Sequence, residues 1–143
     1  MYITQISVFV ENKPGRLADI AGIIAEAGID IRALSLADTT DFGILRLIVN
    51  DPERAAGALK AHGLTVNRTN VIGVALEDRP GALYSVLDIL RRESIGVEYT
   101  YAFITRKTDG AFVILRVQDN ERAAQALISH GVALLESSEV YEI

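Results

Sequence analysis

The chain has 143 residues, of which 50% are hydrophobic, so it is long and apolar enough to bury a core. It contains no cysteine, which excludes disulfides, thiolate metal sites and cysteine nucleophiles and favours a cytoplasmic protein. With 14 basic and 19 acidic residues its net charge is −5, which argues against binding a nucleic acid through bulk electrostatics.

The sequence of the chain repeats itself. The segment Glu53–Ala56 recurs as Glu121–Ala124, 68 positions later, and Pro14–Gly15 recurs as Pro80–Gly81, 66 positions later. Two copies of a unit of roughly 70 residues are too few for a solenoid. The repeat therefore predicts two small domains, residues 1–68 and 69–143.

In the first unit, apolar residues alternate over Tyr2–Val10, which predicts a strand. A helix with an apolar stripe begins at Leu17 and ends at Gly28. The remaining predicted elements are strands over Ile29–Leu36 and Ile44–Val49, a helix from Asp51 to His62 opened by a capping aspartate and a proline, and a last strand from Leu64.

The second unit repeats this order. Its predicted elements are Val71–Leu76, Ala82–Glu93, Val97–Ile104, Ala111–Val117, Glu121–His130 and a final strand near Glu139–Tyr141. The order predicts an α+β fold of two tandem ferredoxin-like βαββαβ units, with antiparallel sheets and helices on one face. In the strand at Val97–Ile104, one face carries Tyr99, Tyr101 and Phe103 and the other carries Ala102 and Ile104. Both faces are apolar, so we expect the second face, or an edge, to pack on another copy.

A Pro-Gly pair opens the first predicted helix of each unit. The first amides of a helix have no partner inside the helix and lie at the positive end of its dipole, so they can bind a carboxylate. Glycine at Gly15 and Gly81 leaves these amides without a neighbouring β-carbon, and proline fixes the backbone before them. The same pattern is also an ordinary capped turn, and its recurrence in both units favours a binding role.

These turns resemble the opening of an ACT domain. Asn12-Lys13-Pro14-Gly15-Arg16-Leu17 is similar to the family's D/N-x-P-G-x-L turn, and Gly28–Ile31 is similar to its G-[IV]-[ND]-[IV] segment. The second unit carries Asp78–Leu83 and, after two additional residues, Gly96–Tyr99. The resemblance covers nearly the whole chain. It implies a pair of regulatory modules that bind amino acids and pair side by side, with ligands between one domain's first turn and its neighbour's second strand.

The resemblance also implies which residues bind the ligand. Backbone amides of each turn would take the carboxylate, and Asn12 would orient the ligand. Because Asn12 can donate or accept while ionised Asp78 only accepts, we expect the first turn to bind an anion more tightly. The implied residues are Asn12, Pro14, Gly15, Arg16, Leu17 and Asp30 for the first site, and Asp78, Pro80, Gly81, Ala82, Leu83 and Glu98 for the second.

Other site chemistries find less support in the sequence. His62 and His130 each precede the glycine that ends a helix, where an imidazole stabilises the negative helix terminus, so we predict no metal. RNA-recognition domains share the strand order, but their basic, aromatic strand is matched here only by Phe112. An acyl-phosphate hydrolase would need Arg16 or Arg79 together with a polar residue that positions water, and no asparagine is clearly placed for this.

The sequence thus predicts a non-catalytic, cytoplasmic regulatory protein without cofactor, metal, nucleic-acid or membrane partner. It would form a homodimer, bind a free amino acid or related small carboxylate, and transmit that binding to a client enzyme of amino-acid metabolism. The alternatives left open are a regulatory or assembly subunit without ligand sensing, and a small ferredoxin-like enzyme.

Overall fold

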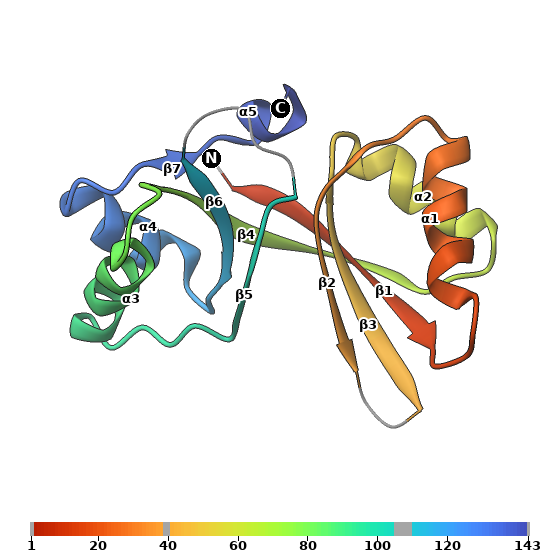
Figure 1. Ribbon diagram of the computed structural model, residues 1–143, viewed down its shortest axis with the longest axis horizontal. Helices are drawn as coiled ribbons and strands as arrows, with labels where there is room; N and C mark the ends of the chain where they lie inside the picture. The colour runs from red at the N-terminus through yellow and green to blue at the C-terminus, as the bar shows by residue number, and fades with distance from the viewer. Residues whose placement is uncertain (1, 39–40, 105–109, 143) are drawn as a thin grey trace.

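The computed structural model describes residues 2–38, 41–104 and 110–142 (Figure 1). The first unit comprises β1 (Ile3–Glu11), α1 (Arg16–Glu26), β2 (Ile31–Asp38), β3 (Phe42–Val49), α2 (Pro52–Ala61) and the first half of β4 (Val66–Leu76). The second unit comprises the rest of β4, α3 (Ala82–Arg92), β5 (Tyr99–Ala102), β6 (Ala111–Arg116), α4 (Asn120–Ser129), β7 (Leu134–Leu135) and α5 (Ser137–Glu142). The predicted fold class is confirmed: the chain holds two units of the βαββαβ type.

A single strand joins the two units. The sheet order is β2-β3-β1-β4-β6-β5, with β7 also paired to β4. Residues 66–71 of β4 pair with β1, and residues 72–76 pair with β6. Thus β4 is both the last strand of the first unit and the first strand of the second. The predicted boundary between residues 68 and 69 lies inside this strand.

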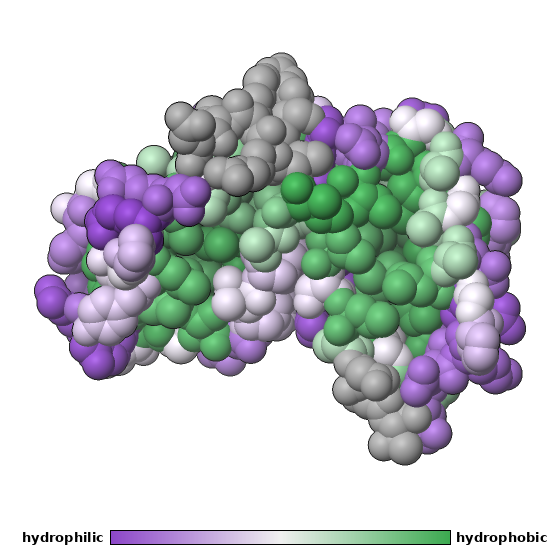
Figure 2. Space-filling view, viewed as in Figure 1, coloured by the Kyte–Doolittle hydropathy of each residue, from purple (hydrophilic) through white to green (hydrophobic). Residues whose placement is uncertain are grey.

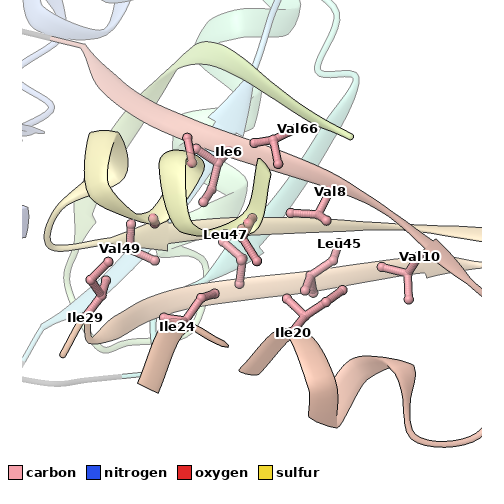
Figure 3. Close-up of a cluster of buried hydrophobic side chains, with 13 residues drawn as sticks. Ile6, Val8, Val10, Ile20, Ile24, Ile29, Leu45, Leu47, Val49 and Val66 are labelled. Atoms are coloured by element: carbon pink, nitrogen blue, oxygen red, sulfur yellow. The ribbon is translucent and has the colours of Figure 1, made fainter. Parts of the chain in front are cut away.

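Each unit buries a core between its two helices and its part of the sheet. In the first unit, Ile6, Val8 and Val10 alternate along β1 and pack against Ile20 and Ile24 of α1, all of them buried (Figure 3). In the second unit the corresponding buried residues are Ile72 and Val74 of β4, Val86 and Leu90 of α3, and Val113, Leu115, Ala123, Ala124 and Leu127. The periods of two and of three to four residues in the sequence therefore mark the faces that pack together.

A third core lies between the units. The helices α1 to α4 lie on the outer sides of the molecule, and the helix-free faces of the two parts of the sheet meet in the middle (Figure 1). This core contains Ile3, Ala33, Ile48, Val71, Ile114, Leu135 and Val140, all buried. An isolated bridge between Ala33 and Phe103 brings β2 beside β5. The aromatic face of β5, which we expected to pack on another copy, is covered inside the chain by the first unit.

A buried polar contact also ties the units together. Gln5 of β1 has no exposed surface, and its amide donates to the Tyr99 hydroxyl at 2.8 Å and accepts from the Tyr101 hydroxyl at 2.6 Å. Both tyrosines belong to β5 of the other unit. Since a buried amide is stable only when its hydrogen bonds are made, this contact fixes β5 against β1.

The prediction of a final strand near Glu139–Tyr141 was wrong. The last strand is β7, only two residues long, and residues 137–142 form the helix α5. The side chain of Glu139 accepts a hydrogen bond at 2.9 Å from the backbone N–H of Glu136, as in a capping box, and this favours a helix start. Val140 is then fully buried in the core between the units, where α5 covers the start of β1.

The end of α3 shows where the second unit gained two residues. Gly28, which ends α1, has a φ of 72°, and Ser94 takes the corresponding left-handed conformation after α3 with a φ of 56°. The backbone bonds agree: Ile29 donates to Ile24 at 3.1 Å and Ile95 donates to Leu90 at 2.9 Å. The sequence comparison places the two additional residues near Arg92 to Ile95, whereas the structure places them after Ile95.

The buried Tyr101 hydroxyl predicts that the protein loses folding stability at alkaline pH. The pKa of the Tyr101 hydroxyl is raised well above its ordinary value of about 10, mainly by burial and to a smaller extent by the electrostatic effect of the neighbouring Tyr99. Below pH of about 10 both the folded and the unfolded chain keep this proton, whereas above it only the unfolded chain releases it, so stability falls as pH rises. We expect Tyr101→Phe to flatten this loss in urea unfolding measured from pH 9 to 11, while Tyr84→Phe, at a side chain that is 63% exposed, leaves it unchanged. Equal slopes for both variants would contradict the assignment.

Candidate functional site: two open helix entrances

The first helix of each unit begins without a side-chain cap. Gly15 before α1 and Gly81 before α3 have φ of 86° and 87°, a left-handed conformation that residues with a β-carbon adopt only with strain. In contrast, Asp51 and Asp119 cap α2 and α4 by accepting from backbone N–H groups at 3.2 and 3.1 Å. In both units, therefore, the start of the first helix lacks a side-chain cap and the start of the second helix is capped by an aspartate.

Some amides at the open entrances have no partner among the described residues. Arg16 donates to Lys13 at 3.3 Å and Asp19 donates to Gly15 at 2.9 Å, but the N–H groups of Leu17 and Ala18 between them make no such bond. At α3, Ala82 and Ser85 are bonded in the same way, at 3.3 and 3.0 Å. A β-carbon built on Gly15 or Gly81 would meet nothing within 4 Å, so the space beside each glycine is open.

Equivalent hollows border the two entrances. The hollow of the first unit has a volume of about 820 Å³ and is lined by Glu11 and Arg16 of the turn, by Phe9 and Phe42, and by residues of α1 and of the α2–β4 connection. The hollow of the second unit has a volume of about 520 Å³. Matching positions of the repeat line both: Phe9 and Ala75, Val10 and Leu76, Glu11 and Glu77, Phe42 and Gly110, and Thr65 and Ala133.

The side chains around the first turn are exposed and charged. Lys13 pairs with Glu11 at 3.0 Å, and this hydrogen bond lowers the pKa of the Glu11 carboxyl. Arg16 pairs with Asp19 at 3.4 Å. The backbone N–H of Asn12 donates to Asp41 at 3.2 Å, which anchors the turn to the start of β3. In the second turn Arg79 pairs with Glu77 at 2.5 Å, and Asp78 is exposed.

Asp30 and Glu98 lie away from the turn of their own unit. β1 and β2 are both antiparallel to β3, so the start of β2, next to Asp30, lies at the opposite end of the sheet from the end of β1. Asp30 accepts from the nearly buried Arg32 at 2.6 Å, and its N–H donates to Asn50 at 2.9 Å. Glu98 pairs with Arg116 at 3.5 Å. The structure therefore does not join either residue to the turn of its own unit.

The two histidines are placed as predicted, at helix ends. His62 and His130 follow the last residues of α2 and α4, and the Nδ1 atoms lie 2.9 and 2.8 Å from the carbonyls of Ala58 and Ala126. Within residues 2–38, 41–104 and 110–142, no group of three His, Cys, Asp or Glu side chains is placed to hold a metal. In the same ranges, no helix combines the length and the apolar character needed to span a membrane.

The hollow residues Phe9, Phe42 and Thr65 were missed by sequence reasoning. They lie on β1, on β3 and in the connection before β4, and only the sheet register brings them to the end of β1. A signal was present, because their counterparts Ala75, Gly110 and Ala133 occur at the offsets of 66 and 68 that define the repeat. These pairs show that side chains at this place are larger in the first unit than in the second.

Comparisons with known proteins agree with this architecture. A crystal structure of a protein from Bacteroides thetaiotaomicron is 38% identical, with a TM-score of 0.93, covering 100% of this chain and 98% of that one. The regulatory subunits of aspartate kinase from Thermus thermophilus and Thermus flavus are 18% and 15% identical, with TM-scores of 0.64 and 0.60, each covering 88% of this chain and 90% of theirs. These two show a common fold. No match was found among curated proteins.

The family assignment follows from the sequence as a whole. A family profile described as an ACT domain pair matches residues 1–143. It agrees with the two βαββαβ units and with the two Pro-Gly turns, at Pro14–Gly15 and Pro80–Gly81, that open α1 and α3. This chain therefore belongs to the ACT domain pair family.

Proposed function

We propose that the protein is a cytoplasmic, non-catalytic sensor that binds a free amino acid at its open helix entrances and reports the binding to a client enzyme. The observation that carries this proposal is the contrast between glycine-capped α1 and α3 and aspartate-capped α2 and α4. Free amides at a helix start favour an anionic carboxylate through hydrogen bonds and the helix dipole. The fold shared with aspartate kinase regulatory subunits is consistent with a regulatory role.

The hollow next to α1 supports an amino acid with an apolar side chain. Val10, Ile20 and Leu64 line this hollow, and Phe9 and Phe42, which are 43% and 54% exposed, border it at the end of β1 and the start of β3. Burying such surface against an apolar side chain is favourable by about 25 cal/mol per Å². The second hollow has alanine and glycine in place of the phenylalanines, so we expect it to contribute less binding energy.

A second copy of the chain would complete the site. Beyond Ala33 the second half of β2 is an edge strand, and Leu34 and Leu36 on it are 37% and 49% exposed. Figure 2 shows apolar surface over the part of the first unit where β2 lies. Unpaired edges with apolar side chains favour strand pairing. Pairing of two β2 edges would bury these leucines and form the side-by-side dimer expected of the family.

Binding would act on a partner by linkage. A ligand held between two subunits favours the arrangement in which both halves of its site are present, and it shifts that equilibrium by its difference in affinity for the two arrangements. Aspartate kinase regulatory subunits share this fold, which supports an enzyme of amino-acid metabolism as the client.

We expect Gly15→Val to abolish ligand-induced stabilisation in a thermal-shift screen of the twenty amino acids. Valine would fill part of the open space beside this turn, and its left-handed φ would be strained. Gly131→Val is the matched control, because Gly131 also has a positive φ, of 79°, and open space around it, but it ends α4. A shift that survives Gly15→Val would remove this turn from the site.

The same screen distinguishes the other roles. A flat profile across all twenty amino acids in the wild-type protein would contradict sensing and leave a regulatory or assembly subunit. Hydrolysis of acetyl phosphate that disappears in Arg16→Gln would instead support the enzyme alternative, because that reaction needs a cation at the turn.

A further inference from the structure

One row of polar side chains crosses the helix-free face of the first unit. The register places Ser35 opposite Arg46, Arg46 opposite Ser7, and Ser7 opposite Asn67. These four residues, called the polar row below, lie side by side on β2, β3, β1 and β4. The row next to it, toward the end of β1, is apolar and consists of Ala37, Ile44 and Phe9.

The second unit shows that the fold does not require this row. At the equivalent positions of the second unit, Ile114 replaces Arg46, Gly73 replaces Ser7 and Leu135 replaces Asn67. These three residues pair with one another in the same register. Tyr101 stands opposite Ile114 on the edge strand. In the second unit the row is buried in the core between the units, whereas in the first unit Ser7, Ser35 and Arg46 are half-buried and Asn67 is exposed. The polar row is therefore a feature of one copy alone.

Arg46 is held in place without an acceptor. Its guanidinium carbon lies 3.7 Å from the ring centroid of Tyr99, and the Tyr99 hydroxyl is in turn fixed by Gln5. Among the residues that the structure describes, none accepts a hydrogen bond from the Arg46 guanidinium or forms an ion pair with it. Arg116, its neighbour across Tyr99, is occupied by Glu98 at 3.5 Å and by the Val117 carbonyl at 2.7 Å. Arg46 thus presents a preorganised fork of donors.

Serines stand opposite Arg46 on both neighbouring strands. Ser7 accepts from the Gln5 amide at 3.3 Å, and its own hydroxyl hydrogen has no acceptor within the described residues. Ser35 is the cross-strand neighbour of Arg46 on the other side. A guanidinium with serines at both cross-strand neighbours matches a planar carboxylate and an adjacent hydroxyl group, and the net charge of −5 disfavours polyanions.

We propose that the polar row is a binding site for a small hydroxycarboxylate, with the carboxylate on Arg46 and the hydroxyl group on Ser7 or Ser35. This site lies on the helix-free face, so it is distinct from the helix entrances and does not depend on the function proposed for them. Tyr99 forms part of it from the other unit, so occupancy would also add a contact across the boundary between the units.

The test is a titration of the ¹⁵N-labelled protein with L-lactate, followed by NMR. We expect shifts of the Arg46 side chain and of the backbone amides of Ser7, Ser35 and Asn67. Arg46→Met should weaken binding about tenfold or more, because hydrogen bonds to charged groups are lost. Arg46→Lys keeps the positive charge but loses the forked donors of the guanidinium, so its affinity for lactate should lie between those of the wild type and Arg46→Met. Acetate and inorganic phosphate should both bind more weakly than lactate.

Arg68→Met is the matched control. Arg68 neighbours Asn67 on β4 but points to the helix side, where it pairs with Glu53 at 2.8 Å, so its loss should leave lactate binding unchanged. Several outcomes would overturn the proposal: no shifts, shifts that persist in Arg46→Met, or phosphate binding as tightly as lactate. Shifts confined to Leu17 and Ala18 would place the carboxylate at the helix entrance instead. A change of oligomeric mass in Arg46→Met without lactate shifts would assign the row to an interface between copies.

Discussion

Gln5→Leu is expected to lower the free energy of unfolding by about 2–4 kcal/mol, because each buried polar group left without a partner costs about 1–3 kcal/mol. The substitution conserves the approximate size of the side chain but leaves the hydroxyls of Tyr99 and Tyr101 without the amide that pairs them. Urea unfolding at neutral pH measures the change directly. Because the contact joins β1 to β5, the loss should weaken the association of the two units.

Two further variants separate this polar contact from packing. Adding Tyr99→Phe and Tyr101→Phe to Gln5→Leu should recover much of the lost stability, because the two tyrosine hydroxyls that lose their partner are then absent. Gln125→Leu, at an exposed position on α4, should change stability by less than about 0.5 kcal/mol. A Gln5→Leu variant as stable as the wild type would show that the two hydroxyls find other partners.

Gly73→Ala should destabilise the protein by about 1–3 kcal/mol through overpacking of the core between the units. A β-carbon at Gly73 would lie 2.4 Å from Cδ1 of Ile3 and 3.1 Å from two atoms of Leu135. Ile3 and Leu135 are buried, so neither side chain can move away without disturbing its neighbours. Chemical denaturation gives the change in free energy, and a lower midpoint with an unchanged slope is the expected result.

The clash can be relieved on purpose. Ile3→Val removes the Cδ1 atom, so the double variant should be more stable than the sum of the two single changes implies. Gly22→Ala is the matched control: it is exposed in the middle of α1, nothing lies within 4 Å of the added carbon, and it should stabilise by up to about 1 kcal/mol. If Gly73→Ala and Gly22→Ala behaved alike, close packing at Gly73 would not limit stability.

Local patterns predicted the fold inside each unit, because strand alternation and helical stripes depend on near neighbours. Tyr2–Val10 and Leu17–Gly28 correspond to β1 and α1 within a few residues. The arrangement between the units was not predictable in this way. It depends on Gly73, whose missing side chain lets Ile3 and Leu135 pack closely, and on Val140 of α5, which is buried in the core between the units. Neither position is part of a periodic hydrophobic pattern in the sequence.

The candidate site was predictable only in part. The glycines at the helix entrances follow from the rules of helix capping and were found at Gly15 and Gly81. The hollows beside them were not found, because Phe9, Phe42 and Thr65 meet through the register of β1 with its neighbours. The roles implied for Asp30 and Glu98 depend on a neighbouring subunit and stay predictions.

The strand β4 constrains how this chain can vary. Its residues 66–71 and 72–76 belong to different units, yet one pleat runs through all of them, with Val71, Gly73 and Ala75 on the same side. Inserting a single residue at its midpoint would rotate everything downstream to the opposite side and turn the second hydrophobic core outward. Length changes between these two domains are thus tolerated only in pairs, and neither half can be exchanged for a homologue without preserving this parity.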